Sequence, residues 1–182
     1  MTTNIEREYT LRIFVNTWGN YNENGADGGE WLELPMDETE LQEELDRIAE
    51  AMGDPDPEWC IHDYEWGAFD MGEISEYDSI DKWNEICQEL DMIDSDDLDV
   101  IKAAIEAWSY TPTEALDRFQ RGCFTFYPGM DLDEVAEELV EDCYFTKDTP
   151  DIFRTYFDYA AFARDLRFDG YEETSLGVIC DC

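Results

Sequence analysis

Carboxylates are the side chains with which this sequence could do most of its chemistry, and they are arranged in rows. From Tyr77 to Trp108, ten carboxylates stand against two lysines. Among them Asp81, Glu85 and Glu89 recur every four residues, so a helix would carry them on one face at steps of about 6 Å. Like charges at this spacing repel, so helix stability does not explain the row. Nucleic acid presents its phosphates on the same length scale. The plainer alternative is a solvated helix face.

Residue patterns typical of catalytic and metal-binding sites are absent from the sequence or incomplete. The sequence contains no phosphate-binding loop, dinucleotide fingerprint or zinc-ligand spacing. His62 is the only histidine, and its place on an expected strand favours a structural role over that of a base. Asn20, Asn22 and Asn24 imitate the front of a calcium loop but supply no carboxylate, and Trp31 stands where the bidentate glutamate belongs. We therefore expect no enzymatic activity, no cofactor and no bound metal.

The overall charge restricts the class of partner. With 48 acidic and 11 basic residues, the formal net charge is −37. Such a chain is repelled by nucleic acid and by anionic membranes, and it is attracted to basic surfaces such as those with which proteins hold DNA. Its hydrophobic content of 43% argues against disorder. Residues 1–10 form no signal peptide, and no apolar run approaches the ~18 residues of a membrane span. We expect a folded, cytoplasmic protein that binds neither nucleic acid nor membrane.

Six cysteines are scattered along the chain without a Cys-x-x-Cys motif. Cys87 and Cys143 fall on the apolar faces of expected helices, where reduced structural cysteines are common. We expect free thiols rather than a disulfide framework. The remaining four are Cys60, Cys123, Cys180 and Cys182.

The first third of the chain predicts a ββαβ unit. Strands are expected at 11–18, around 31–34 and at 59–64, because these stretches are rich in β-branched and aromatic residues. A turn-forming segment from Gly19 to Gly29 joins the first two strands as a long-looped hairpin. A helix follows, with Asp37 as its N-cap and Gly53 at its end. Its acidic face carries Glu43, Asp46 and Glu50.

The middle of the chain predicts two acidic helices. In the first, Ile80, Trp83, Ile86, Cys87 and Leu90 form an apolar face opposite the row of Asp81, Glu85 and Glu89. The second is expected to be capped by Ser95 and to turn Asp99 and Glu106 away from its core face.

The last third predicts another α+β unit. Thr111-Pro112-Thr113-Glu114 is a strong helix start. A strand is expected at 123–127, then a helix capped by Asp131, a helix within 157–166 capped by Asp158, and one final strand at 171–179. On the helix after Asp131, an acidic row lies opposite an apolar face that includes Cys143. The row consists of Glu134, Glu137, Glu138 and Glu141.

These elements indicate an α+β protein of several small parts. At 182 residues the chain fits one elongated domain or two to three small units. The small residues between Gly67 and Gly72 and the helix start at Thr111 mark the boundaries. We therefore expect an N-terminal α+β domain at 1–72, an acidic helical domain at 73–110 and a C-terminal α+β domain at 111–182.

Four stretches of the sequence resemble the ArdA family of antirestriction proteins. Their order, spacing and acidity together carry the resemblance, which spans nearly the whole chain. The stretches are Gly-Glu-Trp-Leu-Glu-Leu-Pro at 29–35, Trp-Cys-Ile-His-Asp-Tyr-Glu at 59–65, Ser-Ile-Asp at 79–81 and Tyr-Phe-Asp-Tyr-Ala-Ala-Phe-Ala-Arg-Asp-Leu at 156–166. The sequence departs from the family pattern in the loop at 19–29 and in the tail at 179–182.

The resemblance implies an elongated homodimer of three-domain subunits that mimics bent B-form DNA. Such a protein would occupy the DNA-binding groove of Type I restriction-modification enzymes, formed by the methyltransferase core with its specificity subunit. Six of the eleven bases lie in the last 65 residues, where self-repulsion is therefore weakest. We expect the dimer contact there, in a region that includes Phe157, Tyr159, Phe162 and Tyr171.

The acidic rows on several helices are the expected mimic surface. Two other classes share the acidity: a salt-adapted enzyme, which would need a pocket of convergent polar groups, and an acidic binder or chaperone of other basic DNA-binding proteins. The acids here are interleaved with core residues, whereas acidic chaperones often carry theirs in disordered tails. The expected surface consists of Glu43, Asp46, Glu50, Asp81, Glu85, Glu89, Asp99, Glu106, Glu134, Glu137, Glu138 and Glu141.

Overall fold

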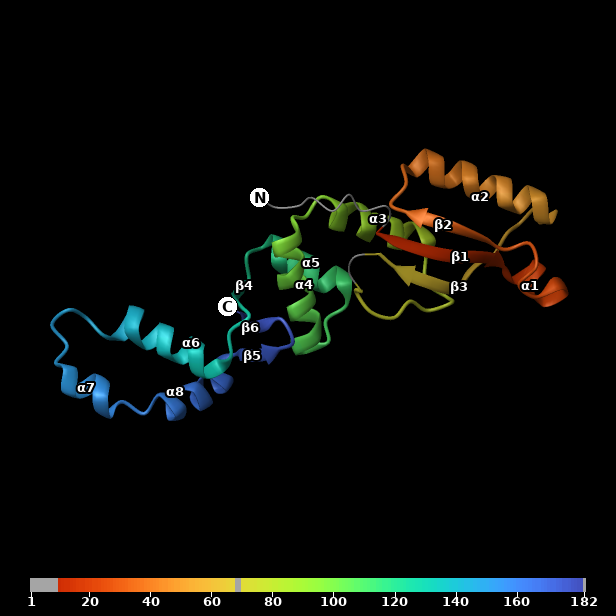
Figure 1. Ribbon diagram of the computed structural model, residues 1–182. Helices are drawn as coiled ribbons and strands as arrows, with labels where there is room; N and C mark the ends of the chain where they lie inside the picture. Colours follow the sequence, from red (N-terminus) through yellow and green to blue (C-terminus); the bar gives the residue numbers. More distant parts are fainter. Residues whose placement is uncertain (1–9, 68–69, 182) are drawn as a thin grey trace. The chain divides into compact units, whose positions relative to one another are not determined.

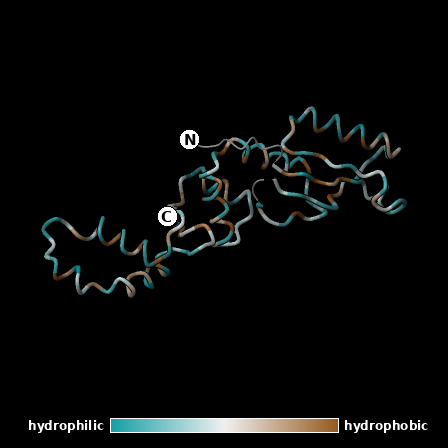
Figure 2. Tube along the Cα trace, viewed as in Figure 1, coloured by the Kyte–Doolittle hydropathy of each residue, from teal (hydrophilic) through white to brown (hydrophobic). Residues whose placement is uncertain are grey.

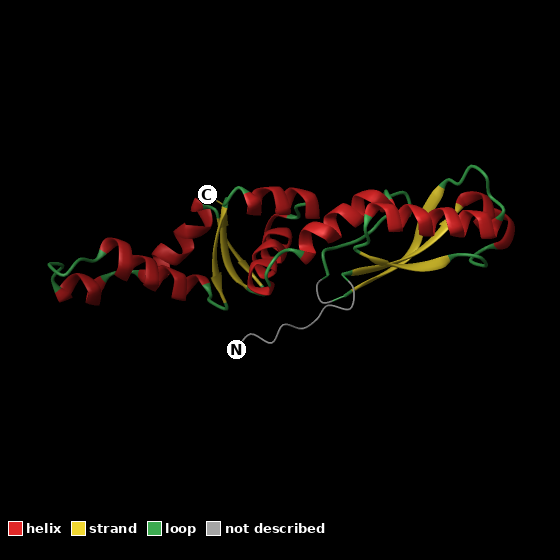
Figure 3. Cartoon of the chain, turned by 90° about the horizontal axis from the view of Figure 1, so that it is seen from above, coloured by secondary structure: helices red, strands yellow, loops and turns green. Residues whose placement is uncertain are grey.

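The computed structural model describes residues 10–67 and 70–181. Helices are combined with strands that form two three-stranded antiparallel sheets (Figures 1 and 3), so the expected mixture of α and β structure is confirmed. The chain divides into two compact units, Met1–Leu98 and Asp99–Cys182. The division into three domains stays a prediction.

The sheet of the N-terminal unit has the strand order β2-β1-β3. Its strands are β1 (Leu11–Thr17), β2 (Glu30–Leu34) and β3 (Trp59–Trp66). β1 pairs antiparallel with both neighbours, and a β-bulge interrupts its register with β3 between Phe14 and Val15. Leu11, Ile13 and Val15 are fully buried, so every second side chain of β1 lies on the core face of the sheet.

Helix α2 (Glu38–Met52) lies along one face of this sheet (Figure 1). The Asp37 side chain accepts the backbone N–H of Thr39, and Gly53 ends the helix in the left-handed conformation. Both ends are therefore as predicted. Leu41, Leu45 and Ile48 are buried on the sheet side. Figure 2 shows the resulting alternation of apolar and polar residues along the helix.

The segment expected to be a turn-forming loop contains a helix, α1 (Trp18–Asn24). The prediction was wrong because the local hydrogen bonds made by Asn and Thr side chains outweigh their turn preference here. Thr17 caps the helix by accepting the N–H of Asn20. An asparagine ladder then fixes it: Asn24 donates to the Asn20 side chain at 2.9 Å, and Asn20 donates to the Asn16 side chain at 2.9 Å.

The two acidic helices of the middle stretch are confirmed as α3 (Ile80–Asp91) and α4 (Ser95–Trp108). Ser79 caps α3. Ser95 is the first residue of α4 rather than its cap, because the carbonyl of Asp94 accepts from the N–H groups of Asp97 and Leu98. The predicted connector between 67 and 72 includes residues 68 and 69, which lie outside the described residues.

The sheet of the C-terminal unit has the order β4-β6-β5. Helix α5 (Pro112–Gln120) precedes it, with the predicted capping box between Thr111 and Glu114. The strands are β4 (Phe124–Pro128), β5 (Tyr171–Thr174) and β6 (Gly177–Asp181). The final strand expected at 171–179 is thus a hairpin. Gly177 permits it, since a Cβ there would overlap the Tyr127 carbonyl oxygen.

Helices α6 (Leu132–Leu139) and α8 (Tyr159–Leu166) pack against each other and against this sheet. Their shared core contains Leu132, Val135, Ala163 and Leu166. Asp131 and Asp158 cap the two helices, as predicted. Three short elements were not predicted: the π-helix η1 (Val140–Tyr144), helix α7 (Asp151–Tyr156) and the 3₁₀ turn η2 (Arg167–Asp169).

Side-chain contacts join the end of α4 to the C-terminal sheet within the second unit. The Trp108 ring stacks on Phe124 with centroids 5.9 Å apart. The Tyr110 hydroxyl donates to Asp181 at 2.9 Å, and Arg118 also donates to both oxygens of that carboxylate. These contacts cross the predicted boundary between residues 110 and 111.

Candidate functional site

The acidic row of α2 is exposed along its whole length. Glu43, Asp46 and Glu50 face solvent on the side opposite the buried leucines. Arg47 lies beside this row, but it pairs with Glu30 at 2.7 Å and with Glu44 at 2.8 Å. Its hydrogen bonds lower the pKa of Glu30 and raise that of Arg47 itself. The one cation of the helix is therefore engaged outside the predicted row.

The row on α3 is exposed and rests on a well-anchored helix. Asp81, Glu85 and Glu89 all face solvent. On the opposite face the buried Asn84 side chain accepts the N–H of Met36 at 2.8 Å and donates to the Met36 carbonyl at 3.0 Å. Because a buried amide with both groups bonded fixes its neighbours, these bonds hold the row in place.

The two predicted acids of α4 have different surroundings. Asp99 is half-buried. Glu106 is exposed, but its two oxygens accept from the Ser175 N–H at 2.7 Å and from the Ser175 hydroxyl at 2.6 Å. Glu106 therefore holds the turn between β5 and β6 in addition to carrying charge. Sequence reasoning missed this role because the two residues are 69 positions apart.

The acidic row on α6 differs along its length. Among the described residues, the exposed side chains of Glu137 and Glu138 make no hydrogen bond or ion pair. Glu134 belongs to the capping box of α6 and accepts from the N–H of Asp131 at 3.0 Å. Glu141 accepts from the Tyr159 hydroxyl at 2.9 Å and pairs with Arg154.

The π-helix changes which residues follow the apolar face of α6. The N–H of Phe145 donates to the carbonyl of Val140, five residues back. Because a π turn contains more residues than an α turn, the residues after Leu139 are rotated out of the α-helical register. Val140 is fully buried and Cys143 is exposed. The prediction that Cys143 continues the apolar face is therefore wrong.

The thiols differ in burial. Cys60, Cys87, Cys123, Cys143 and Cys180 are free, as expected, and Cys182 lies outside the described residues. The Cys60 sulfur lies 3.2 Å from the Nε2 atom of His62, so a thiol and an imidazole meet here. Burial raises the pKa of Cys60 to about 11, so its thiol stays protonated at neutral pH. This contact does not generate a thiolate nucleophile.

The rings expected at the dimer contact are half-buried within the subunit itself. The centroid of the Phe157 ring lies 4.9 Å from that of Tyr159 and 5.9 Å from that of Phe162. The ring centroids of Tyr171 and Tyr127 are 6.3 Å apart. The most exposed apolar side chains of this unit lie beside them. They are Phe168 at 85% exposure, Tyr156 at 79%, Tyr144, Ile152 and Phe153.

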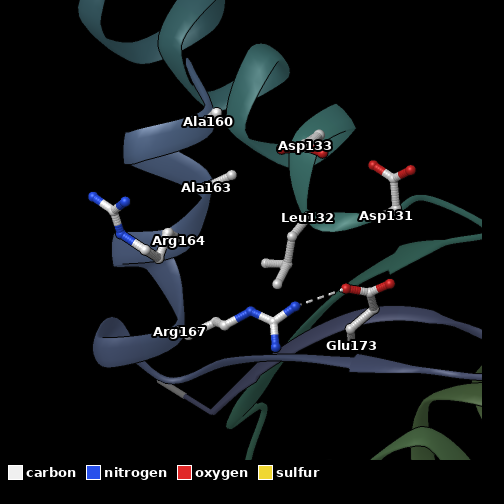
Figure 4. A pocket seen from close by; sticks show the side chains of 8 residues that line it. All are labelled: Asp131, Leu132, Asp133, Ala160, Ala163, Arg164, Arg167 and Glu173. Carbon is white, nitrogen blue, oxygen red and sulfur yellow. Dashed lines mark hydrogen bonds and ion pairs between the residues drawn. The ribbon is translucent and has the colours of Figure 1, made fainter. Parts of the chain in front are cut away.

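A hollow of about 350 Å³ lies between the start of α6, helix α8 and strand β5 (Figure 4). Arg164 and Arg167 line it together with Asp131, Asp133 and Glu173. Arg167 donates to Glu173 at 3.2 Å, and the Asp131 carboxylate caps α6. Arg164 pairs with Asp165 at 3.7 Å. Two of the carboxylates and both guanidinium groups of the hollow thus have partners within the chain.

Within residues 10–67 and 70–181, no three His, Cys, Asp or Glu side chains converge as metal ligands. None of the helices there is both long and apolar enough to cross a bilayer.

Comparison with known protein families identifies a match over most of the chain. The model of the family described as Antirestriction protein (ArdA) matches residues 13–179, which is nearly the whole chain. No curated protein sequence matches it.

Proposed function

The chain belongs to the ArdA family of antirestriction proteins, and from that premise we propose that it works as a DNA mimic. Its acidic helix faces would occupy the DNA-binding groove of a Type I restriction-modification enzyme, formed by the methyltransferase core and the specificity subunit. DNA that enters the cell would then escape restriction. On this proposal the protein inhibits by binding and carries out no reaction itself.

The observation that carries the proposal is the exposure of carboxylates in rows along the helices, with few cations paired to them. Glu137 and Glu138 are a clear case, because neither side chain has a hydrogen bond or an ion pair among the described residues. Unpaired exposed acids raise the electrostatic energy of the free protein. A groove lined with lysine and arginine would recover that energy, as it does with phosphates.

The rigidity of the helices supports the same function. Capping boxes begin α5 and α6, and Ser79 and Asp37 cap the two helices of the N-terminal rows. Fixed helices present their charges without a further ordering cost on binding, and this preserves affinity. An acidic disordered tail would lose part of its binding energy to ordering.

We further propose that the active form is a homodimer held through the C-terminal unit. The exposed Tyr156 and Phe168 are large apolar side chains in the part of the chain that is richest in arginine. Burying them between two copies would remove apolar surface from water. Light scattering at micromolar concentration should give the mass of two chains, and a Tyr156→Ser/Phe168→Ser variant should shift it toward one. A parent protein that scatters as a monomer would refute the dimer.

The mimic is tested by competition for DNA. A Type I methyltransferase complex is bound to a labelled duplex, and the protein is titrated in at several salt concentrations. We expect displacement of the duplex, weaker displacement as salt rises, and no binding of the protein to the duplex alone. Histones serve as a control for unselective binding to basic proteins. The mimic is refuted if the complex keeps all its DNA at saturating protein.

A further inference from the structure

Four aromatic rings gather at one end of the N-terminal unit, and we refer to them as the aromatic platform: Trp18, Tyr21, His62 and Tyr77. Trp18 stacks on Tyr77 with centroids 5.4 Å apart, and Tyr21 stacks on His62 at 4.0 Å. The rings come from α1, from β3 and from the turn before α3 (Figure 1). The segment that contributes Trp18 and Tyr21 was expected to be an irregular loop.

The platform is partly open to solvent. Tyr77 is 74% exposed and Tyr21 39%, so these rings do not serve mainly to fill the core. A carboxylate accompanies them, because the exposed Glu76 directly precedes Tyr77 in the chain. No Lys or Arg among the described residues lies over any of the four rings.

The same combination of ring and carboxylate holds an arginine at three other places in this chain. In each, the guanidinium carbon lies 4.8 to 5.0 Å from the ring centroid while the guanidinium pairs with an acid. These arrangements combine cation–π attraction with an ion pair. The three sets are Arg12 with Trp31 and Glu65, Arg118 with Tyr110 and Asp181, and Arg154 with Phe145 and Glu141.

We propose that the aromatic platform, together with Glu76, is a receptor for an arginine side chain of the protein partner. A guanidinium would lie against the exposed Tyr77 ring and pair with the neighbouring carboxylate. If the partner is the restriction enzyme of the proposed function, the arginine belongs to its DNA-binding groove. The platform would then add recognition of a specific side chain to the distributed attraction of the acidic rows.

The platform is rigid enough to recognise a side chain. The asparagine ladder and the Thr17 cap hold α1. The N–H of Ile61 donates to the Glu76 carbonyl at 3.2 Å, which ties the turn that carries Tyr77 to β3. The segments that carry Tyr21 and Tyr77 therefore need not be ordered on binding, so the attraction between the rings and a guanidinium is retained as affinity.

A peptide experiment tests the receptor independently of the restriction enzyme. The probe is a short peptide of glycine and serine that is blocked at both ends and has one arginine at its centre as its only charged group. The matched peptide has citrulline, which has nearly the same shape without the charge. We expect the arginine peptide to shift the NMR ring signals of Tyr21 and Tyr77, and the citrulline peptide to leave them in place. Equal shifts with both peptides, or shifts spread over all tyrosines, would overturn the proposal.

Variants connect the receptor to inhibition. Tyr21→Ala/Tyr77→Ala should bind the Type I methyltransferase complex about two- to fivefold more weakly, as expected for a cation–π contact. Tyr77→Phe keeps the ring and should retain most of the affinity. Met92→Ala removes a similarly exposed apolar side chain that belongs to neither the platform nor the acidic rows, and it should leave binding to the enzyme unchanged; circular dichroism confirms that each variant is folded. If the parent protein fails to bind the enzyme, the proposed function is wrong while the peptide experiment still decides the receptor. Unchanged affinity in the double alanine variant overturns the receptor's part in inhibition.

Discussion

The acids of the row on α6 differ in their side-chain partners. Substitutions in this row can therefore separate the effect of charge on inhibition from the effect of lost contacts on stability. Glu137→Gln should weaken inhibition by about 0.3–1 kcal/mol, in line with an exposed ion pair, and should leave the melting temperature unchanged. Glu141→Gln also disturbs the bonds to Arg154 and Tyr159, so it should lower the free energy of unfolding by about 0.5–1 kcal/mol. Thermal melts and inhibition titrations of both variants measure the contrast. Loss of all activity in folded Glu137→Gln would indicate a discrete site instead.

The capping box of α5 predicts a dependence on pH. Hydrogen bonds from the Thr111 N–H and hydroxyl lower the pKa of Glu114 below its ordinary value of 4.5. Because the folded pKa is the lower one, the stabilisation is complete above 4.5 and is lost as the pH falls through the folded pKa. In Glu114→Gln the side chain can still bond but no longer titrates. The stability advantage of the parent should therefore shrink on acidification from pH 6 to about pH 3. An advantage that grows with acidity would contradict this account.

At the scale of elements, the sequence predicted what is local. Asp37, Asp131 and Asp158 were identified as caps because cap chemistry acts over three or four residues. Helix α1 was missed because its asparagine side chains bond to one another, which a count of turn-forming residues does not register. The π-helix was missed because one extra residue per turn leaves no signature in an α-helical pattern.

The packing of α6 on α8 gives a prediction at the same scale. Leu132 is 4% exposed in the core that these helices share, so Leu132→Ala should cost about 2–5 kcal/mol of unfolding free energy. Glu138→Ala on the opposite face should cost less than about 0.5 kcal/mol. Denaturant titrations of the two variants provide the comparison. Similar costs would mean that the helix is not packed as described.

For the molecule as a whole, the charge sets the response to salt. With a net charge of −37, self-repulsion opposes folding, and added salt screens it. The melting temperature should rise with sodium chloride, while the two buried cores keep a folded signal at low salt. Circular dichroism at two salt concentrations checks both statements. A random-coil spectrum at low salt would favour a salt-adapted or disordered protein.

Some features of the candidate site could be predicted from the sequence and others could not. Exposure of the rows on α2, α3 and α6 follows from helical spacing, so the sequence was sufficient for it. The second roles of Glu106 and Glu141 were not predictable, since their partners lie 69 and 18 residues away. The aromatic platform was missed for the same reason: its rings meet only after three segments have folded together.

The asparagine ladder also bears on how long the protein keeps its covalent structure. In an asparagine-glycine pair such as Asn24-Gly25, the backbone nitrogen of the glycine readily attacks the side-chain amide, and the asparagine becomes aspartate or isoaspartate. Here that nitrogen donates to the Tyr21 carbonyl at 2.8 Å, and the Asn24 amide donates to Asn20 at 2.9 Å. Cyclisation must first release both groups. The rate of deamidation at Asn24 therefore depends on how often α1 opens, so chemical ageing at this position records local unfolding.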